Sequence, residues 1–206
     1  MDKINTKSKI KSIALNLFNR MGTLSVSLNS IAKEVGISPG NLRYHYKTRE
    51  EIILDLYYDM QTKIESLNSF EAILTADNPL KIMAVVFDKY GEIFWFYRFI
   101  MRDAFVLITL DPALREILVI NRENKMKQIA GFLKFLASEG IIQNIHNDEI
   151  ELRIKLHWFI PAYWQIFAST FGDITKNSIQ ESKEIIFKFL LFPYLTEKGL
   201  ELYKQI

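Results

Sequence analysis

The chain has 206 residues, 49% of them hydrophobic and none of them cysteine, and its mean hydropathy is near zero. This composition indicates a soluble protein with enough apolar surface for a core, and it excludes disulfide scaffolds, thiol catalysis and cysteine-bound zinc. The net charge is only +2, but it is unevenly distributed: residues 1–49 carry +7 (nine Lys or Arg against two acidic residues), and the rest carries −5 (17 against 22). Residues 1–49, the basic head, are therefore expected to bind a polyanion.

The first predicted helix covers residues 10–21, where hydrophobic residues recur at the spacing of one helix face. Gly22 is expected to end it. The residues before it contain lysines, but no apolar stretch follows them, so we expect no signal peptide. The lack of cysteine suits a reducing compartment, and we expect a cytoplasmic protein.

The segment that follows contains residues that favour the starts and ends of helices. Ser27 is predicted to cap a second helix, which Gly36 ends at a turn where a positive φ is cheap for glycine. Ser38 is predicted to cap a third helix, with Pro39 at its first position, where the missing N–H costs nothing. The sequence TREE, residues 48–51, is typical of a capping box and predicts a long fourth helix.

Residues 28–46 are therefore predicted to form a helix, a tight turn and a second helix, which together make a helix-turn-helix. The small side chain of Ala32 allows the two helices to cross closely. Ile37 and Leu42 are expected to fill the space between them, and Tyr46, four residues after Leu42, is expected to pack inside the domain.

The third helix is expected to present a polar face to DNA. Because consecutive residues turn by about 100°, an inward Leu42 puts Gly40 and Tyr44 on the opposite side. Arg43 and Asn41 beside them can form bidentate hydrogen bonds with guanine and adenine edges, respectively. With side chains that suit phosphate oxygens, the predicted DNA-binding set is Ser27, Ser38, Gly40, Asn41, Arg43, Tyr44, His45, Lys47 and Arg49.

These residues resemble the DNA-binding signature of the TetR family of bacterial transcriptional regulators. The resemblance is carried by residues 30–53, SIAKEVGISPGNLRYHYKTREEII, and by the LF…MG ending of the first helix. The family usually has tyrosine after the leucine of the third helix, where this chain has Arg43, so no operator sequence carries over. The resemblance implies a DNA-binding domain, residues 1–49, and a helical domain, residues 50–206, that binds an effector and dimerises.

The resemblance also implies a function. The chain is expected to be a ligand-responsive regulator in the bacterial cytoplasm, a repressor by analogy with the family, that binds a palindromic DNA operator as a homodimer. A largely apolar small molecule is expected to release it, and the fourth helix, from about residue 49, is expected to connect the two domains. No cofactor, metal ion or membrane is implied.

Beyond residue 75 the pattern stays helical. Breaks are expected at residues 75–79, 111–112, 139–148 and 172–178, with four to five helices of about 15–30 residues between them, lengths that are normal for bundles. No alternating strand pattern competes, so the predicted fold class is all-α. The uncharged residues 156–172 are expected to form a buried helix rather than a membrane span.

Two aromatic-rich stretches, residues 90–108 and 156–167, are candidates for the effector pocket, because aromatic walls with few polar groups hold apolar ligands. Core packing is the alternative for most of these side chains. At least two of Arg98, Arg102 and Asp103 are expected to be exposed. The predicted pocket residues are Tyr90, Phe94, Tyr97, Met101, Phe105, Trp158 and Trp164.

Two C-terminal helices, at about residues 148–171 and 178–204, carry more apolar surface than one small core can cover. Family members pair such helices with those of a second copy in a four-helix bundle. The predicted dimer interface is Leu156, Ile160, Tyr163, Phe167, Ile186, Phe189 and Leu190.

Two alternatives belong to other functional classes. A helical enzyme is disfavoured because no nucleotide-binding, zinc-protease or serine-hydrolase motif occurs and the three histidines, His45, His146 and His157, are far apart in the sequence. His157, on an apolar helix, is expected to be a core histidine. The other alternative is an interaction module whose helical hairpin has a solvated basic face.

Overall fold

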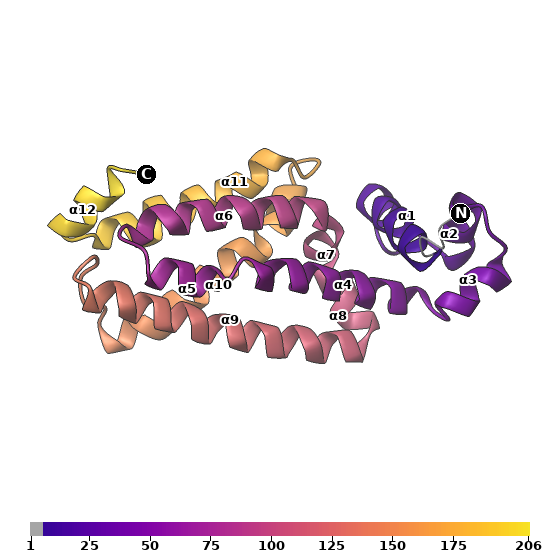
Figure 1. The fold of residues 1–206 in the computed structure, drawn as a ribbon, viewed down its shortest axis with the longest axis horizontal. Helices are drawn as coiled ribbons and strands as arrows, with labels where there is room; N and C mark the ends of the chain where they lie inside the picture. Colours follow the sequence, from indigo (N-terminus) through magenta and orange to yellow (C-terminus); the bar gives the residue numbers. More distant parts are fainter. Residues whose placement is uncertain (1–5) are drawn as a thin grey trace. The chain divides into compact units, whose positions relative to one another are not determined.

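The computed structural model describes residues 6–206, which form helices joined by short turns and, among these residues, a single isolated antiparallel bridge between Ile142 and Leu195 (Figure 1). The predicted all-α fold is confirmed. Residues 1–5, which fall in the predicted DNA-binding domain and include the charged Asp2 and Lys3, lie outside the described part.

The described chain forms two compact units, and neither unit is one continuous stretch of sequence. Unit 1 contains residues up to 63 together with residues 96–115. Unit 2 contains residues 64–95 and 116–206. A segment far along the chain thus packs with the N-terminal helices, which the sequence patterns did not predict.

Unit 1 is built around the N-terminal helices. It comprises α1 (Thr6–Met21), α2 (Leu28–Val35), α3 (Pro39–His45), most of α4 (Arg49–Ser66), α7 (Arg98–Arg102), α8 (Ala104–Leu110) and the start of α9 (Pro112–Ser138). Its fully buried side chains come from several of these helices. They include Ile10, Phe18, Ile31, Leu42, Ile52 and Phe99.

The predicted caps of unit 1 are confirmed. The Ser27 hydroxyl oxygen accepts a hydrogen bond from the backbone N–H of Ser30, and Gly36 ends α2 with a φ of 78°. Ser38 caps α3 in the same manner. The cap of α4 differs in one respect, because the carboxylate of Glu51 accepts from the backbone N–H of Lys47 rather than from that of Thr48.

Unit 2 contains both long and short helices. They are α5 (Ser69–Leu74), α6 (Pro79–Phe96), most of α9, α10 (Asn147–Ser169), α11 (Lys176–Ile185) and α12 (Glu197–Tyr203). Helix α10 packs against α11. The unit closes over a hydrophobic core that includes Leu80, Met83, Leu133, Leu136, Ile186 and Phe187.

The predicted helix lengths need correction in two places. The expected single helix at 178–204 ends in a π-helical turn, Ile186–Leu191, and a 3-10 turn, Phe192–Tyr194, before α12 begins. Pro193 lies in this break, and proline has no N–H to continue a helix. The segment between residues 79 and 110 is also divided, into α6, α7 and α8.

None of the helices in residues 6–206 is long and apolar enough to cross a membrane. The uncharged segment 156–172 lies mainly in α10. It was expected to be buried throughout, but one face of it is exposed, with Phe159 at 57% and Phe167 at 50% of their full exposure. The segment therefore has one face exposed to solvent, although it carries no charge.

Candidate nucleic-acid interface

The structure gives α3 the orientation that the sequence predicts. Leu42 is fully buried, whereas Tyr44 is 86% exposed and Asn41, Arg43 and Lys47 are exposed as well. Gly40 is also exposed, and because glycine has no side chain, its backbone is accessible to solvent. A short capped helix thus holds an arginine, an amide and a phenol side by side on its solvent face.

The remaining predicted contact residues differ in how available their side chains are for binding DNA. His45 is half-buried, and its ring meets the Tyr44 ring edge-on with 5.3 Å between the centroids. Ser27 and Ser38 are exposed, but their hydroxyl oxygens already accept the capping bonds of α2 and α3. The two serines therefore stabilise the helix starts that would face DNA.

Arg49 was predicted to contact phosphate, and the structure gives it another role. Its Nη1 donates to the carbonyl oxygens of Thr23 at 2.9 Å and Val26 at 3.5 Å, and its Nη2 lies 2.8 Å from Glu50 Oε1. A guanidinium that is partly buried and already paired has little left to offer a phosphate. Arg49 instead ties the turn between α1 and α2 to the start of α4.

A network at the end of α3 was missed by the sequence patterns. Tyr46, the buried residue that ends α3, donates its hydroxyl hydrogen to Asp55 Oδ2 of α4 at 2.6 Å. Lys7 and Lys11 of α1 lie 3.0 and 3.3 Å from the same carboxylate, and Lys11 also lies 2.6 Å from Asp59. The network therefore joins α1, the end of α3 and α4.

The charges of this network perturb its titration. Burial by itself raises the pKa of the Asp55 carboxyl, but the hydrogen bonds from Tyr46 and Lys7 and the charge of Lys11 together bring that pKa below its usual value. Burial, with the hydrogen bond to Asp55, raises the pKa of the Tyr46 phenol. A signal for the network exists in the sequence, because Lys7 and Lys11 on one helix share the four-residue spacing of Asp55 and Asp59 on another.

These ion pairs change how the basic head is interpreted. Lys7 and Lys11 are paired with carboxylates of α4, and Arg49 is paired with Glu50. Part of the positive surplus of residues 1–49 is therefore neutralised inside unit 1. The cations that α3 and its end present to solvent are Arg43 and Lys47.

The seven predicted pocket residues fall in both compact units. Tyr90, Phe94, Trp158 and Trp164 belong to unit 2, whereas Tyr97, Met101 and Phe105 belong to unit 1. Tyr97 is buried at 2% exposure, and Phe105 is 73% exposed. In unit 2 the indole N–H of Trp164 donates to Glu181 at 3.2 Å.

Tyr90 contacts the side chains of three other residues of unit 2. Its ring stacks on that of Phe94 with 6.1 Å between centroids, and its hydroxyl lies 2.5 Å from Ser69 Oγ. Lys125 Nζ lies 5.8 Å from the centre of the Tyr90 ring. Burial lowers the pKa of Lys125 more than the charge of Glu65 raises it.

The expectation that at least two of Arg98, Arg102 and Asp103 are exposed is wrong. All three are partly buried. Arg102 and Asp103 form an ion pair 2.7 Å apart, in which Arg102 binds the end of α1 and Asp103 binds the turn that follows it. Adjacent opposite charges inside a hydrophobic run were the signal for such a pair.

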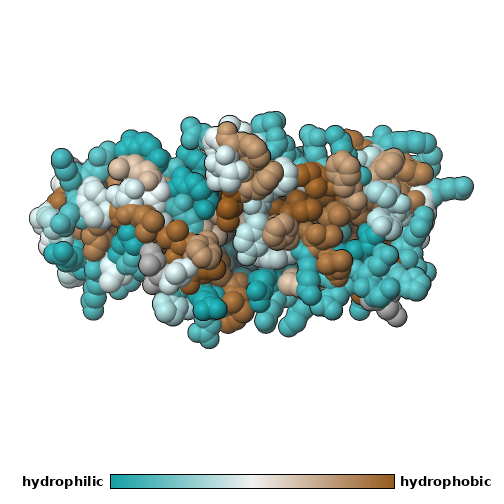
Figure 2. All heavy atoms as spheres, turned by 180° about the vertical axis from the view of Figure 1, so that it is seen from behind, coloured by the Kyte–Doolittle hydropathy of each residue, from teal (hydrophilic) through white to brown (hydrophobic). Residues whose placement is uncertain are grey.

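The predicted dimer residues lie mostly on an apolar surface of unit 2. Leu156, Tyr163, Phe167 and Phe189 are exposed, and Ile160 and Leu190 are half-buried. Ile186 was placed on this surface wrongly, because it is buried in the core of unit 2 at 2% exposure. Figure 2 shows a brown hydrophobic patch right of centre, over unit 2. Further exposed hydrophobic residues on α10, α11 and the turns after them are Leu152, Phe159, Phe171 and Phe192.

Comparison with known proteins agrees with this geometry. The profile described as bacterial regulatory proteins, tetR family, matches residues 10–56, and a second profile, described as bacterial transcriptional repressor, matches residues 60–203. The chain belongs to the TetR family.

Individual relatives of this TetR-family protein are distant in sequence. A helix-turn-helix-type transcriptional regulator of Staphylococcus aureus is 25% identical over 187 residues, which cover 73% of this chain and 97% of the relative. A TetR-family transcriptional regulator from Marinobacter aquaeolei shares the fold with a TM-score of 0.82 at 25% identity, over 98% of this chain and 97% of that one. The SmeT–triclosan complex has a TM-score of 0.65 at 11% identity and covers 94% of this chain and 93% of SmeT.

Family membership decides between the functional classes that the sequence left open. TetR-family proteins are DNA-binding transcriptional regulators and not enzymes. The helical enzyme and the interaction module that does not bind DNA are therefore both excluded.

Proposed function

We propose that this TetR-family regulator is a repressor that binds a palindromic operator as a homodimer in the bacterial cytoplasm and leaves it when a small effector binds. The observation that carries the DNA-binding part is the solvent face of α3, where Arg43, Asn41 and Tyr44 surround a buried Leu42. In this proposal residues 1–49 read DNA, residues 50–206 bind the effector and dimerise, and α4 connects the two. Arg49 is no longer among the proposed phosphate contacts.

Arg43 and Lys47 are expected to act differently on DNA. Arg43→Ala should cost about 1–3 kcal/mol at one base position per half-site and relax the sequence preference there, because a bidentate contact to a base edge is lost. Lys47→Ala should weaken binding to all sequences alike and reduce the slope of log affinity against log salt by about 1. Binding to a randomised operator library and titrations at several salt concentrations measure both effects.

Arg122→Ala is the matched control for these variants, because Arg122 is exposed on α9 and lies outside unit 1. It should change neither the sequence preference nor the salt slope. An unchanged preference at every base position in Arg43→Ala would remove Arg43 from the proposed base-reading set. A Lys47→Ala protein with the salt slope of the unaltered chain would remove Lys47 from the phosphate contacts.

We further propose that the effector is a largely apolar molecule with one acidic group, which binds against Tyr90 and Phe94 in unit 2. The stacked rings offer an apolar wall, and the partly buried Lys125 amine lies over one of them. An anion beside a partly buried cation offsets the cost of removing that cation from water. The fold neighbour SmeT, solved with triclosan, supports the general point that a protein of this fold can hold a small molecule.

The acidic group can be tested with matched ligands. Among apolar aromatic or alkyl carboxylic acids and their methyl esters, each acid should bind about 10-fold more tightly than its ester, because a charge-assisted hydrogen bond to Lys125 is lost in the ester. Thermal shift at pH 7 followed by titration calorimetry measures the difference. It should vanish in Lys125→Met and persist in Lys127→Met, since Lys127 is exposed on the same helix. Esters that bind as well as acids would overturn this assignment.

A further inference from the structure

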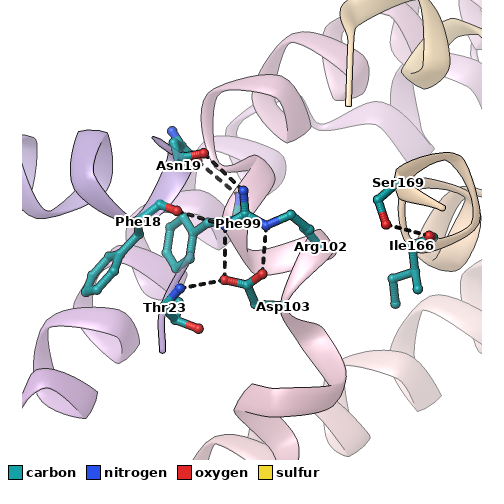
Figure 3. Close-up of polar contacts among 8 residues, drawn as sticks. All are labelled: Phe18, Asn19, Thr23, Phe99, Arg102, Asp103, Ile166 and Ser169. Atoms are coloured by element: carbon teal, nitrogen blue, oxygen red, sulfur yellow. Dashed lines mark hydrogen bonds and ion pairs between the residues drawn. The ribbon is translucent and has the colours of Figure 1, made fainter. Parts of the chain in front are cut away.

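Residues 96–115 lie far beyond the helix-turn-helix in the sequence, yet they form part of unit 1, where α7 packs against α1. Figure 3 shows the polar contacts between the two helices. The guanidinium of Arg102 donates to the carbonyl oxygens of Phe18 at 2.8 Å and Asn19 at 3.0 Å, in the last turn of α1. The carbonyl groups at a helix end have no partners within the helix, and a cation there also interacts favourably with the helix dipole.

A second set of bonds surrounds the first. Asn19 donates from its side-chain amide to the carbonyl oxygen of Phe96 at 2.8 Å and accepts from the backbone N–H of Phe99 at 3.1 Å. The rings of Phe18 and Phe99, both fully buried, lie 5.2 Å apart between centroids. The C-terminal end of α1 is therefore bound by a segment about 80 residues away in the chain, through side chains, backbone and ring packing.

Thr23 is held from two sides. Its backbone N–H donates to Asp103 Oδ2 at 2.8 Å, and its carbonyl oxygen accepts from Arg49 Nη1 at 2.9 Å. Asp103 is in turn held by Arg102, whose Nε donates to Asp103 Oδ1 at 2.7 Å. Thr23 begins the turn that leads from α1 to Ser27, the cap of α2. Residues 102 and 103 on one side and residue 49 on the other therefore fix this turn.

Fixing this turn matters for DNA recognition. Helices α2 and α3 pack together, and α3 carries the proposed base-reading residues. A dimer reads two successive major grooves only when its recognition helices are about 34–36 Å apart. A small shift of α2 and α3 against α4 in each copy would therefore move both recognition helices out of alignment with the grooves. Arg49, at the start of α4, and Asp103 act on opposite sides of the same residue.

We propose that Arg102 and Asp103 are positioning residues for operator recognition, which hold the turn between α1 and α2 and thereby set the position of α2 and α3. The inference rests on the proposed function of α3 in reading the operator. Residues 96–115 continue at their two ends into α6 and α9, whose other residues belong mainly to unit 2. The segment is therefore a covalent connection from unit 2 to the DNA-reading helices in addition to α4.

The test compares specific with non-specific DNA binding in the full-length protein. Arg102→Ala should lower affinity for the operator by roughly 10-fold, the loss expected when about one base contact in the whole operator is misplaced, and should leave affinity for unrelated duplex DNA unchanged. Asp103→Asn should act in the same direction. Arg102→Lys, which keeps the charge but loses the fork that reaches two carbonyls, should restore part of the loss.

Two further measurements keep the proposal falsifiable. Hydrogen exchange without DNA should be faster at the amide of Thr23 in Asp103→Asn than in the unaltered protein, with unchanged exchange at Leu42. Thr23→Val is the matched control at the turn, because the Thr23 hydroxyl has no hydrogen-bond partner among the described residues and the two backbone bonds remain. It should keep the operator affinity.

The outcomes separate this proposal from the proposed function. If the unaltered chain bound its operator no better than unrelated DNA, the proposed function would fail, while the exchange of the Thr23 amide would still report on the turn. Equal losses of specific and non-specific affinity in Arg102→Ala, or unchanged exchange at Thr23 in Asp103→Asn, would show that the pair serves stability alone and would overturn the inference.

Discussion

Phe167→Glu is expected to leave the protein monomeric at micromolar concentration, where we expect the unaltered chain to be a dimer. Phe167 is half-exposed on α10, one helical turn after the exposed Tyr163, and its ring lies 5.1 Å from that of the exposed Phe171 between centroids. A second copy would cover this surface, and the twofold symmetry of a dimer would place two new carboxylates in an apolar interface without partners. Burying such a charge costs several kcal/mol, far more than an interface residue contributes on average.

The loss of the dimer should carry through to DNA. A monomer contacts one half-site, so operator affinity should fall by roughly 100-fold or more toward the non-specific level. Sedimentation velocity gives the assembly state, and operator titration gives the affinity. Val85→Glu is the control, because Val85 is exposed on α6 in the same unit but outside the apolar surface of α10 and α11. A dimeric Phe167→Glu protein, or a monomeric unaltered chain, would contradict the proposed interface.

Gly199→Ala is expected to destabilise unit 2 by about 3 kcal/mol, the upper part of the range for overpacked sites. A Cβ at residue 199 would lie 2.0 Å from the backbone oxygen of Ile141, a distance at which the backbone itself must move. That oxygen also accepts the N–H of Thr196, which leads into α12. The substitution therefore strains the contact by which the C-terminal helix closes on the connection between α9 and α10.

Thermal and urea denaturation of Gly199→Ala measure this effect. At about 2–4 °C per kcal/mol for a chain of this size, the midpoint should fall by roughly 10 °C. Gly40→Ala is the matched control, since its new Cβ would meet no atom closer than 4.0 Å and α3 has ordinary helical geometry there. Its midpoint should stay the same or rise slightly, because alanine favours helix over glycine. Equal midpoints for Gly199→Ala and the unaltered protein would mean that Ile141 and α12 can separate without cost.

The sequence by itself determined the helix-turn-helix, because that motif is specified by local chemistry. Ser27 and Ser38 cap the backbone N–H groups three residues on, and Gly36 takes the positive φ that the turn requires. Leu42 is apolar and faces inward, and helix geometry then places Arg43 and Tyr44 outside. Each of these features depends on residues within one or two turns, and a single sequence displays them.

The extent of the elements was less predictable further along the chain. A hydrophobic pattern continues through residues 178–204, but Pro193 and the π turn before it divide that segment. Periodicity reports which residues are apolar, and it cannot tell whether they face the core or a second copy. Ile186 and Phe189 look alike in the sequence, yet one is buried and the other is 68% exposed.

Only the tertiary structure decided what the charged residues do. Arg49 and Arg102 are separated by more than 50 residues. Arg49 binds the carbonyl oxygen of Thr23, and Arg102 binds the last turn of α1 just before it. In the sequence, Lys7 and Lys11 count toward the positive charge that is expected to bind DNA. In the structure, Asp55 and Asp59 of α4 pair with them. A charged side chain reaches several ångströms and takes whichever partner the fold brings near, so its role depends on contacts between segments that are distant in the sequence.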